Sequence, residues 1–376
     1  MEINKIKAGK ETKMNKEMET IAIIGAGNGG FAMAGDLSLA GLAVNLFEFP
    51  EFEKNIDCLQ KLKEIKITGA ARTGTAKLNL VTSDLSEAVE GADVIMITTR
   101  AGSHERIGKE LAPLLKGGQS VFIMPGSMGS LFLYHELEAL KKKGIMLAET
   151  ITLPYAARKT DPDSVKVLRR TGNLGISAFP ARDTALMFGI FNKYFPASHT
   201  MKNIFEVALC NTNIIAHPIP TLMSASAIER ANGTFNFYGD GHSPCVDRAI
   251  EALDREVGTL LRAFECNVTS PIKAVEYRFS KTSKEIQEMR TAWNITATID
   301  KDMRFISEDV QESLVFVVTL GRQFGIPTPI TESLICLLSL FGEGVDYYNT
   351  GRTMKKLGID HMDKDALLYF LQNGSN

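Results

Sequence analysis

The distribution of apolar and polar residues divides the chain into two parts. Up to about residue 200, short apolar runs alternate with longer amphipathic stretches. The pattern predicts strands at residues 21–24, 43–47, 93–98, 120–124, 146–152, 165–170 and 174–178, with helices at 28–39, 53–64, 82–90 and 105–115 between them. Continuous apolar runs suit strands buried on both faces, so this part predicts an α/β domain with a doubly wound parallel sheet.

Beyond about Met201, most of the sequence carries apolar residues at spacings of three and four, which favours helices. A helix is predicted within 203–220, and another from about 308 to 324, with Ser307 as its N-cap and Gly325 at its end. We therefore expect an α/β domain over 20–200 and an all-helical domain over 201–376. Residues 1–19 mix Lys and Glu without an apolar core and are expected to be a disordered leader.

A glycine-rich turn follows the first predicted strand. Gly25, Gly27 and Gly30 have the G-x-G-x-x-G spacing, which allows a tight turn, close approach of a pyrophosphate, and close packing of helix on sheet. The helix that begins at Asn28 directs its first N–H groups toward the phosphates. The turn therefore predicts a dinucleotide site, and its candidate residues are Gly25, Gly27, Asn28, Gly29 and Gly30.

The next predicted strand ends at Glu48, ~20 residues after the glycines, where an acid commonly accepts hydrogen bonds from the adenosine ribose. Phe49 and Pro50 follow it, and no adjacent Arg or Lys could hold a 2′-phosphate. These features favour NAD as the cofactor, with NADP as the alternative.

Two further loops follow predicted strands at the edge where ligands bind in such sheets. One, at 98–103, contains Arg100, and the other, PGSMGS at 125–130, contains Ser127. We expect both to flank the dinucleotide, with Ser127 near the nicotinamide; tight turns packed by small residues are the alternative. His104 is expected to start a helix rather than to act as a catalyst.

The segment NIFEVALCNTNIIAHPIP contains a candidate acid/base. Asn213 lies four residues before His217, so both side chains are expected on one helix face. Pro218 places His217 at the helix C-terminus, where the dipole would raise the pKa of the imidazole toward neutrality. A buried structural histidine is the alternative.

The cluster RFISED supplies two more candidates. Asp309, in the first turn of the predicted helix, could bind the far nitrogen of His217 and stabilise its cation. Arg304 offers a planar fork for a substrate carboxylate. The local sequence alone favours the alternative, in which Asp309 is a first-turn helix charge and Arg304 a surface residue.

Composition excludes several classes of protein. The chain has 376 residues, 44% of them hydrophobic, and a formal charge of -2, which gives no electrostatic case for nucleic acid. No apolar run reaches the ~18 residues that span a bilayer. The five cysteines lack a C-x-x-C pair and are expected to be reduced thiols of a cytoplasmic protein without a metal site. A homodimer is compatible with the sequence.

Four features together resemble the octopine and nopaline (opine) dehydrogenase family. They are the glycine turn, the N-x-N-x-x-x-H-P run ending in Pro218, the FNFYGDGHSPCVDRAIEALDRE stretch and the 304–309 cluster, in family order. The resemblance implies an NAD(H)- or NADP(H)-binding first domain and a helical second domain that binds an amino acid and a 2-oxo acid. Hydride reduction of their imine would give a secondary-amine dicarboxylate.

The resemblance also implies roles for residues. His217 would be the acid/base and Asp309 its partner, while Arg304 would grip a carboxylate. Asn213 and Tyr238, the latter in the aromatic loop at 235–241, are expected to belong to the substrate pocket; a packed structural loop is the alternative for 235–241.

Two rival functions have support in the sequence. Lys202-Asn203 resembles the lysine–asparagine pair of ketopantoate and glycerol-3-phosphate type reductases, which use the lysine in catalysis. A nucleotide-sensing protein that has lost catalysis is the second rival, because fold alone does not establish activity.

Overall fold

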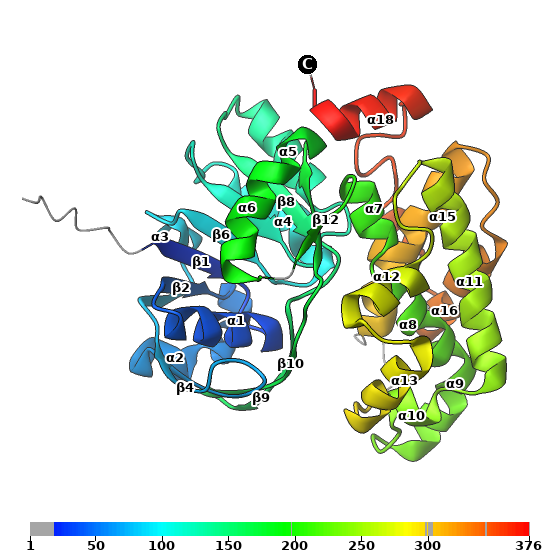
Figure 1. Ribbon diagram of the computed structural model, residues 1–376, viewed down its shortest axis with the longest axis horizontal. Coiled ribbons are helices and arrows are strands. Elements are labelled where there is room, and N and C mark those ends of the chain that lie inside the picture. The colour runs from blue at the N-terminus through cyan, green and yellow to red at the C-terminus, as the bar shows by residue number, and fades with distance from the viewer. Residues whose placement is uncertain (1–18, 197, 298, 300–303, 343, 376) are drawn as a thin grey trace, which may run out of the picture.

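A computed structural model describes residues 19–196, 198–297, 299, 304–342 and 344–375. The predicted leader at 1–19 lies outside the described residues except for Glu19. Figure 1 shows an α/β part, coloured blue to green, beside a helical part, coloured green to orange. The C-terminal helix returns to the α/β part.

An eight-stranded sheet forms the centre of the α/β part, in the order β12-β11-β8-β7-β6-β1-β2-β5. Every neighbouring pair is parallel except β8 and β11. The strands are β1 (Thr20–Ile24), β2 (Ala43–Phe47), β5 (Leu80–Thr82), β6 (Val94–Ile97), β7 (Ser120–Ile123), β8 (Met146–Thr150), β11 (Gly175–Phe179) and β12 (His199–Thr200). The predicted α/β class is confirmed, with one antiparallel pairing added.

Both faces of this sheet are covered by helices. Ile21 and Ile23 of β1 join the core that contains Phe31 of α1 (Asn28–Leu39), whereas Ala22 and Ile24 join a second core on the opposite face. The other helices of this part are α2 (Asp57–Leu62), α3 (Leu85–Val89), α4 (His104–Leu111), α5 (Ser130–Ala139) and α6 (Thr184–Tyr194). Burial on both faces explains the continuous apolar runs.

Several boundaries differ from the prediction. The helix predicted at 53–64 consists of a 3₁₀ segment, Pro50–Asn55, followed by α2. The helix predicted at 82–90 is shorter and is capped by Asp84, whose carboxylate accepts from the N–H groups of Ser86 and Glu87. A carboxylate satisfies the first N–H groups and also suits the positive end of the helix.

A second, four-stranded sheet contradicts one sequence prediction. Its order is β4-β3-β10-β9, with β3 (Glu64–Gly69), β4 (Gly74–Lys77), β9 (Tyr155–Asp161) and β10 (Ser164–Arg170). We expected 165–170 to complete the main sheet, and β9 was not predicted. Strands β9 and β10 alternate buried positions with more exposed ones. The reason is that one face of the small sheet packs on α1 and the other face does not. That alternation is typical of antiparallel edge structure.

The helix predicted within 203–220 is divided into α7 (Ile204–Leu209), α8 (Asn213–Ala216) and α9 (Pro218–Ala231). The first break follows from Asn211, whose side-chain oxygen accepts from the N–H of Asn213 and so replaces a helical bond. Pro218 supplies the second, because it lacks an N–H and begins a new helix well. The remaining helices here include α10 (Phe237–Asp240), α11 (Pro244–Ala263), α12 (Pro271–Phe279), α13 (Ser283–Ala292) and α16 (Pro329–Ser339).

The helix predicted at 308–324 also begins differently. Arg304–Ser307 already forms α14, Asp309–Leu314 is a π-helical segment, and α15 continues over Val315–Gln323. Ser307 is therefore the last residue of a helix and not an N-cap. A π-helical turn accommodates an extra residue within a helix, and such turns are frequent at functional sites.

The last helix, α18 (Lys364–Asn373), packs on the α/β part. Phe370 lies 5.0 Å from Phe179, ring centroid to ring centroid, and the N–H of Ser375 donates to the Tyr134 hydroxyl at 2.7 Å. We propose a domain boundary near residue 200, with α18 returning across it. Among the described residues, no helix combines the length and apolar character needed to cross a membrane.

Candidate active site

The glycine turn has the geometry that its spacing predicts. Gly25 has a φ of +107°, and a Cβ on Gly30 would lie 1.8 Å from the carbonyl oxygen of Gly25. A Cβ on Gly27 would meet no atom within 4 Å. The first and last glycines are therefore required by the fold, whereas the middle one leaves space at the start of α1. No side chain of the described part of the chain caps that helix, so its first N–H groups are available to an anion.

Glu48 lies beside this turn, as predicted. Its buried carboxylate accepts from the N–H of Ala26 at 3.1 Å and from the Asn55 amide at 3.3 Å. Sequence reasoning missed Lys159 of β9, whose N–H donates to the Asn28 side chain at 2.8 Å. Burial lowers the pKa of Lys159, and the charge of Glu48 opposes that shift. The residues present fit a dinucleotide, because there is open space beside Gly27, the first N–H groups of α1 are available, and a carboxylate lies at the end of β2.

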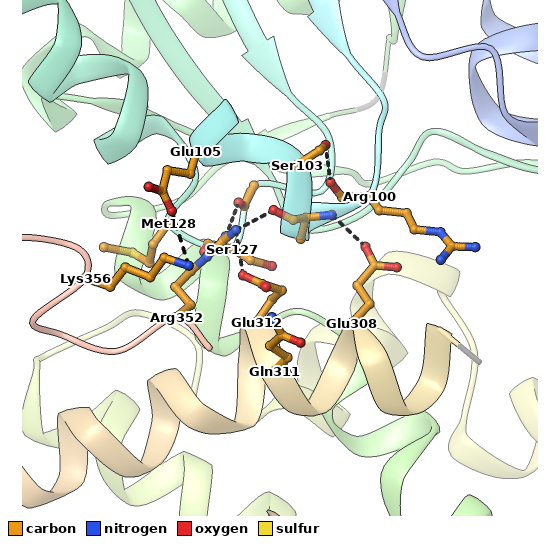
Figure 2. Close-up of polar contacts among 12 residues, drawn as sticks. Arg100, Ser103, Glu105, Ser127, Met128, Glu308, Gln311, Glu312, Arg352 and Lys356 are labelled. Atoms are coloured by element: carbon orange, nitrogen blue, oxygen red, sulfur yellow. Dashed lines mark hydrogen bonds and ion pairs between the residues drawn. The ribbon is translucent and has the colours of Figure 1, made fainter. Parts of the chain in front are cut away.

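The two predicted loops are held differently. Ser127 is buried, with a φ of 47°, and its hydroxyl accepts from the Asn211 amide of the helical part at 3.2 Å. Arg100 is exposed, and its side chain extends away from the polar contacts around it (Figure 2). His104 begins α4 as predicted, and burial lowers its pKa well below the usual value.

Arg352 ties these loops to the helical part, as Figure 2 shows. It is 1% exposed, and its guanidinium donates to the carbonyl oxygens of Ala101 at 2.7 Å and of Ser127, while it pairs with Glu312 at 3.0 Å. Glu308, the N-cap of the π-helical segment that contains Glu312, accepts from the N–H of Ala101 at 3.0 Å. The segment that carries Asp309 is thereby fixed against both loops. Nothing in the local sequence around Arg352 indicates this role.

His217 and Asp309 are brought together as predicted. The Nδ1 of His217 lies 2.6 Å from Oδ2 of Asp309, and both side chains are almost fully buried. Because the carboxylate only accepts, Nδ1 carries the proton, and Nε2 then accepts from the Tyr238 hydroxyl at 2.9 Å. Phe305 stacks on the imidazole with a centroid distance of 3.9 Å. The group can take up and release a proton at Nε2.

The predicted pKa of His217 is wrong in direction. Burial lowers it below the usual value, and Asp309 opposes that shift without reversing it. The sequence prediction relied on the dipole of a preceding helix, but α8 has only four residues and His217 is also the N-cap of the longer α9. A helix N-terminus disfavours a cation, as does the apolar stacking partner.

Arg304 lies at the edge of this site. Its side chain is 49% exposed, and Nε is 3.7 Å from Glu308. Its charge also acts on His217 and on Tyr238. Burial raises the pKa of Tyr238, and the positive charges of the neighbouring arginines oppose that rise without reversing it. Asn213 lies one helical turn before His217, but within the described part of the chain no hydrogen bond joins the two side chains.

Comparisons with known proteins identify the family to which the chain belongs. A family model described as the alpha-helical domain of NAD/NADP octopine/nopaline dehydrogenase matches residues 200–341, and one described as coenzyme F420-dependent NADP oxidoreductase matches residues 20–124. The opine dehydrogenase of Arthrobacter sp. (strain 1C) is 30% identical over 357 residues, which are 91% of this chain and 96% of that protein. The chain belongs to the opine dehydrogenase family.

Members of this family are NAD(P)-dependent oxidoreductases that act on CH–NH groups. Protein ocs of Agrobacterium tumefaciens (strain Ach5) is 24% identical, covering 93% of this chain and 98% of its own. Octopine dehydrogenase with NADH and pyruvate has a TM-score of 0.71 at 16% identity, covering 96% of this chain and 99% of that one. Yersinopine dehydrogenase with NADP+ has a TM-score of 0.69 at 13% identity, over 95% and 98%. These structures confirm the two-part fold.

Proposed function

We propose that this opine dehydrogenase joins the amine of an amino acid to the carbonyl of a 2-oxo acid and reduces the imine to a secondary-amine dicarboxylate. The observation that carries the proposal is the buried His217–Asp309 pair, held by Glu308 and Arg352 against loops of the dinucleotide-binding part. An acid/base facing a hydride donor is what imine formation and reduction require.

The chain's own residues act on protons and on charge. Loss of water from the amine adduct needs a proton, which the imidazolium form of His217 would give from Nε2. Asp309 would stabilise that cation before the transfer, and the transfer leaves a neutral imidazole. In the reverse direction the neutral imidazole would take that proton back. Arg304 would bind a substrate carboxylate, with Asn213 and Tyr238 at the same pocket. When bound, NAD(P)H supplies the hydride.

The proposed cofactor-binding residues are Gly25, Gly27, Asn28, Gly29, Gly30, Glu48, Arg100 and Ser127. Glu48 supports NAD(H) as the preferred cofactor, because a buried carboxylate accepts ribose hydroxyls and repels a 2′-phosphate. Ser127 is proposed to lie near the nicotinamide, since Asn211 ties its loop to the segment that leads to His217.

The direct test is consumption of NADH and of NADPH across a grid of amino acids and 2-oxo acids, with each component omitted in turn. We expect turnover only when amine, oxo acid and coenzyme are all present, and faster with NADH. Turnover with the oxo acid alone would instead favour a simple reductase.

The rival lysine is bound elsewhere. The ammonium of Lys202 donates to the carbonyl oxygen of Glu265 at 2.7 Å and lies 3.7 Å from its carboxylate. Replacement of Lys202 by Ala should therefore spare turnover that replacement of His217 by Ala abolishes. A sensing protein would bind NADH and oxidise none of it with any substrate pair.

A further inference from the structure

Three arginines surround the ring of Phe279 where the small sheet meets the helical part. The guanidinium carbons of Arg278 and Arg169 lie 4.3 and 4.4 Å from the ring centroid, and that of Arg290 lies 5.8 Å from it. Arg169 comes from β10, Arg278 from α12 and Arg290 from α13. Elements of both parts of the chain therefore bring positive charge to one place.

These charges have no carboxylate partner among the residues that the structure describes. Within the described part of the chain, no Asp or Glu oxygen lies within 4.0 Å of any of the three guanidinium groups, as the ion pairs found there all involve other residues. Arg278 is 8% exposed and Arg169 is partly buried, and the Nε of each is buried and has no hydrogen-bond partner among the described residues. Buried charges in proteins are normally paired, so this arrangement indicates an anion that binds from outside.

The electrostatics agree with the geometry. Burial, followed by the charges of Arg290 and Arg169, lowers the pKa of Arg278 to about 9. The group still carries its charge at neutral pH, but in surroundings that disfavour a cation. A bound carboxylate would offset both the cost of burying the guanidinium and the repulsion among the three arginines, because an arginine fork bonds a carboxylate through two parallel N–H donors.

The cluster adjoins the proposed reaction centre. The guanidinium carbon of Arg290 lies 5.5 Å from the ring centroid of Tyr238, and the Tyr238 hydroxyl is bonded to Nε2 of His217. Arg278 donates to Thr212, next to Asn211, which contacts the Ser127 loop. A substrate whose amine or carbonyl reacts beside His217 could therefore extend toward Phe279.

The charges exceed what a simple opine needs. Its two carboxylates sit on the carbons that flank the secondary amine. Arg290, Arg304 and Arg158 act electrostatically on Tyr238 at that centre, and Arg169 and Arg278 add two further charges at the Phe279 ring. Resting on the proposed function, we propose that Arg169, Arg278 and Arg290 bind a third anionic group, on the side chain of one of the two substrates. One substrate is then an acidic amino acid or a dicarboxylic 2-oxo acid, and the product carries at least three carboxylates.

Paired substrates of nearly equal shape test this. One arm compares L-glutamate with L-glutamine, and L-aspartate with L-asparagine, with pyruvate as the oxo acid. The other compares 2-oxoglutarate with 2-oxohexanoate, with L-alanine as the amine. We expect kcat/KM to be at least about tenfold higher for the acidic member in one arm, the order expected of a charge-assisted bond. The arm that responds identifies which substrate bears the anion.

The Arg278→Met variant tests the residue. The methionine side chain fills similar space without charge, so the ratio of kcat/KM for the acidic substrate to kcat/KM for its neutral counterpart should fall toward one. The control variant Arg248→Met, at an exposed arginine of α11, should keep the wild-type ratio. NADH binding and the thermal midpoint establish that each variant is folded. An equal or higher kcat/KM for neutral members in both arms, or an unchanged preference in Arg278→Met, would overturn the inference.

A separate measurement distinguishes this inference from the proposed function. Titration calorimetry with glutarate should show binding to the wild-type protein and weaker binding, by about tenfold or more, to Arg278→Met. Absence of turnover with every pair would refute the proposed function, and the glutarate titration would still decide the anion site. Equal glutarate binding by both proteins would count against the arginine cluster whatever the activity.

Discussion

Replacement of Asp309 by Asn tests the chemistry of the buried pair most directly. The side chain keeps its size but loses its charge, and its amide can donate to Nδ1 of His217. That donation would move the imidazole proton to Nε2, the atom that must exchange protons with substrate. The variant therefore changes the tautomer and the charge stabilisation together, with little change in packing.

The expected magnitude follows from the contact. Asp309 and His217 are 2.6 Å apart and buried, and hydrogen bonds to charged groups contribute roughly 1.5–3 kcal/mol, or about 10- to 150-fold in rate. The wrong tautomer costs more; an equivalent change in a serine protease triad lowers kcat about 10⁴-fold. We expect kcat of Asp309→Asn to fall by about two to four orders of magnitude, with NADH affinity retained.

The pH profile should move in a defined direction. In the wild-type protein, burial lowers the pKa of His217 and Asp309 opposes this. Without the carboxylate, burial acts unopposed and the pKa falls further. Oxidation of the opine needs the neutral base, so its acidic limb should shift to lower pH. Condensation needs the imidazolium, so its alkaline limb should also shift to lower pH.

The assay is the nicotinamide absorbance in both directions across pH, with NADH binding measured by fluorescence. Asp363→Asn is a matched control, because Asp363 caps α18 and asparagine caps helices equally well. A turnover of Asp309→Asn within about threefold of wild type, with unmoved pH limbs, would show that Asp309 does not act through His217.

Five further substitutions have defined outcomes. Gly27→Ala should leave the free energy of unfolding unchanged and weaken NADH binding. Gly30→Ala, whose Cβ would lie 1.8 Å from a backbone oxygen, should unfold at a lower denaturant concentration. A larger loss of stability in Gly27→Ala than in Gly30→Ala would contradict the turn geometry. Glu48→Gln should raise the KM for NADH about tenfold or more, measured with the amino acid and the oxo acid at saturating concentrations. The ratio of kcat/KM with NADH to kcat/KM with NADPH should fall as well. Tyr238→Phe removes a donor that favours the neutral imidazole, so the pH limbs should move up, opposite to Asp309→Asn. Arg352→Met leaves a buried glutamate unpaired and should lower the free energy of unfolding by about 3–5 kcal/mol in urea titrations; a loss below about 1 kcal/mol would exclude a structural clamp.

Local signals were sufficient for much of the fold. The strand, glycine turn, helix and second strand from Thr20 to Phe47 agree with their predicted bounds almost residue for residue, because apolar runs and glycine geometry act within the segment itself. The family motifs likewise placed His217 and Asp309 together, although they are 92 residues apart in sequence.

Tertiary structure decided what depends on distant neighbours. Packing on α1 decided that residues 165–170 belong to the small sheet and not to the main sheet. The roles of Arg278 and Arg352 likewise depend on segments that are remote in sequence and surround them in the fold. The clearest case is the pKa of His217: the local sequence predicted a rise from one helix end, and burial under Phe305 lowers it. Dipoles and turns are readable along a chain, but desolvation depends on every atom that folds over a group, and that is a property of the whole structure.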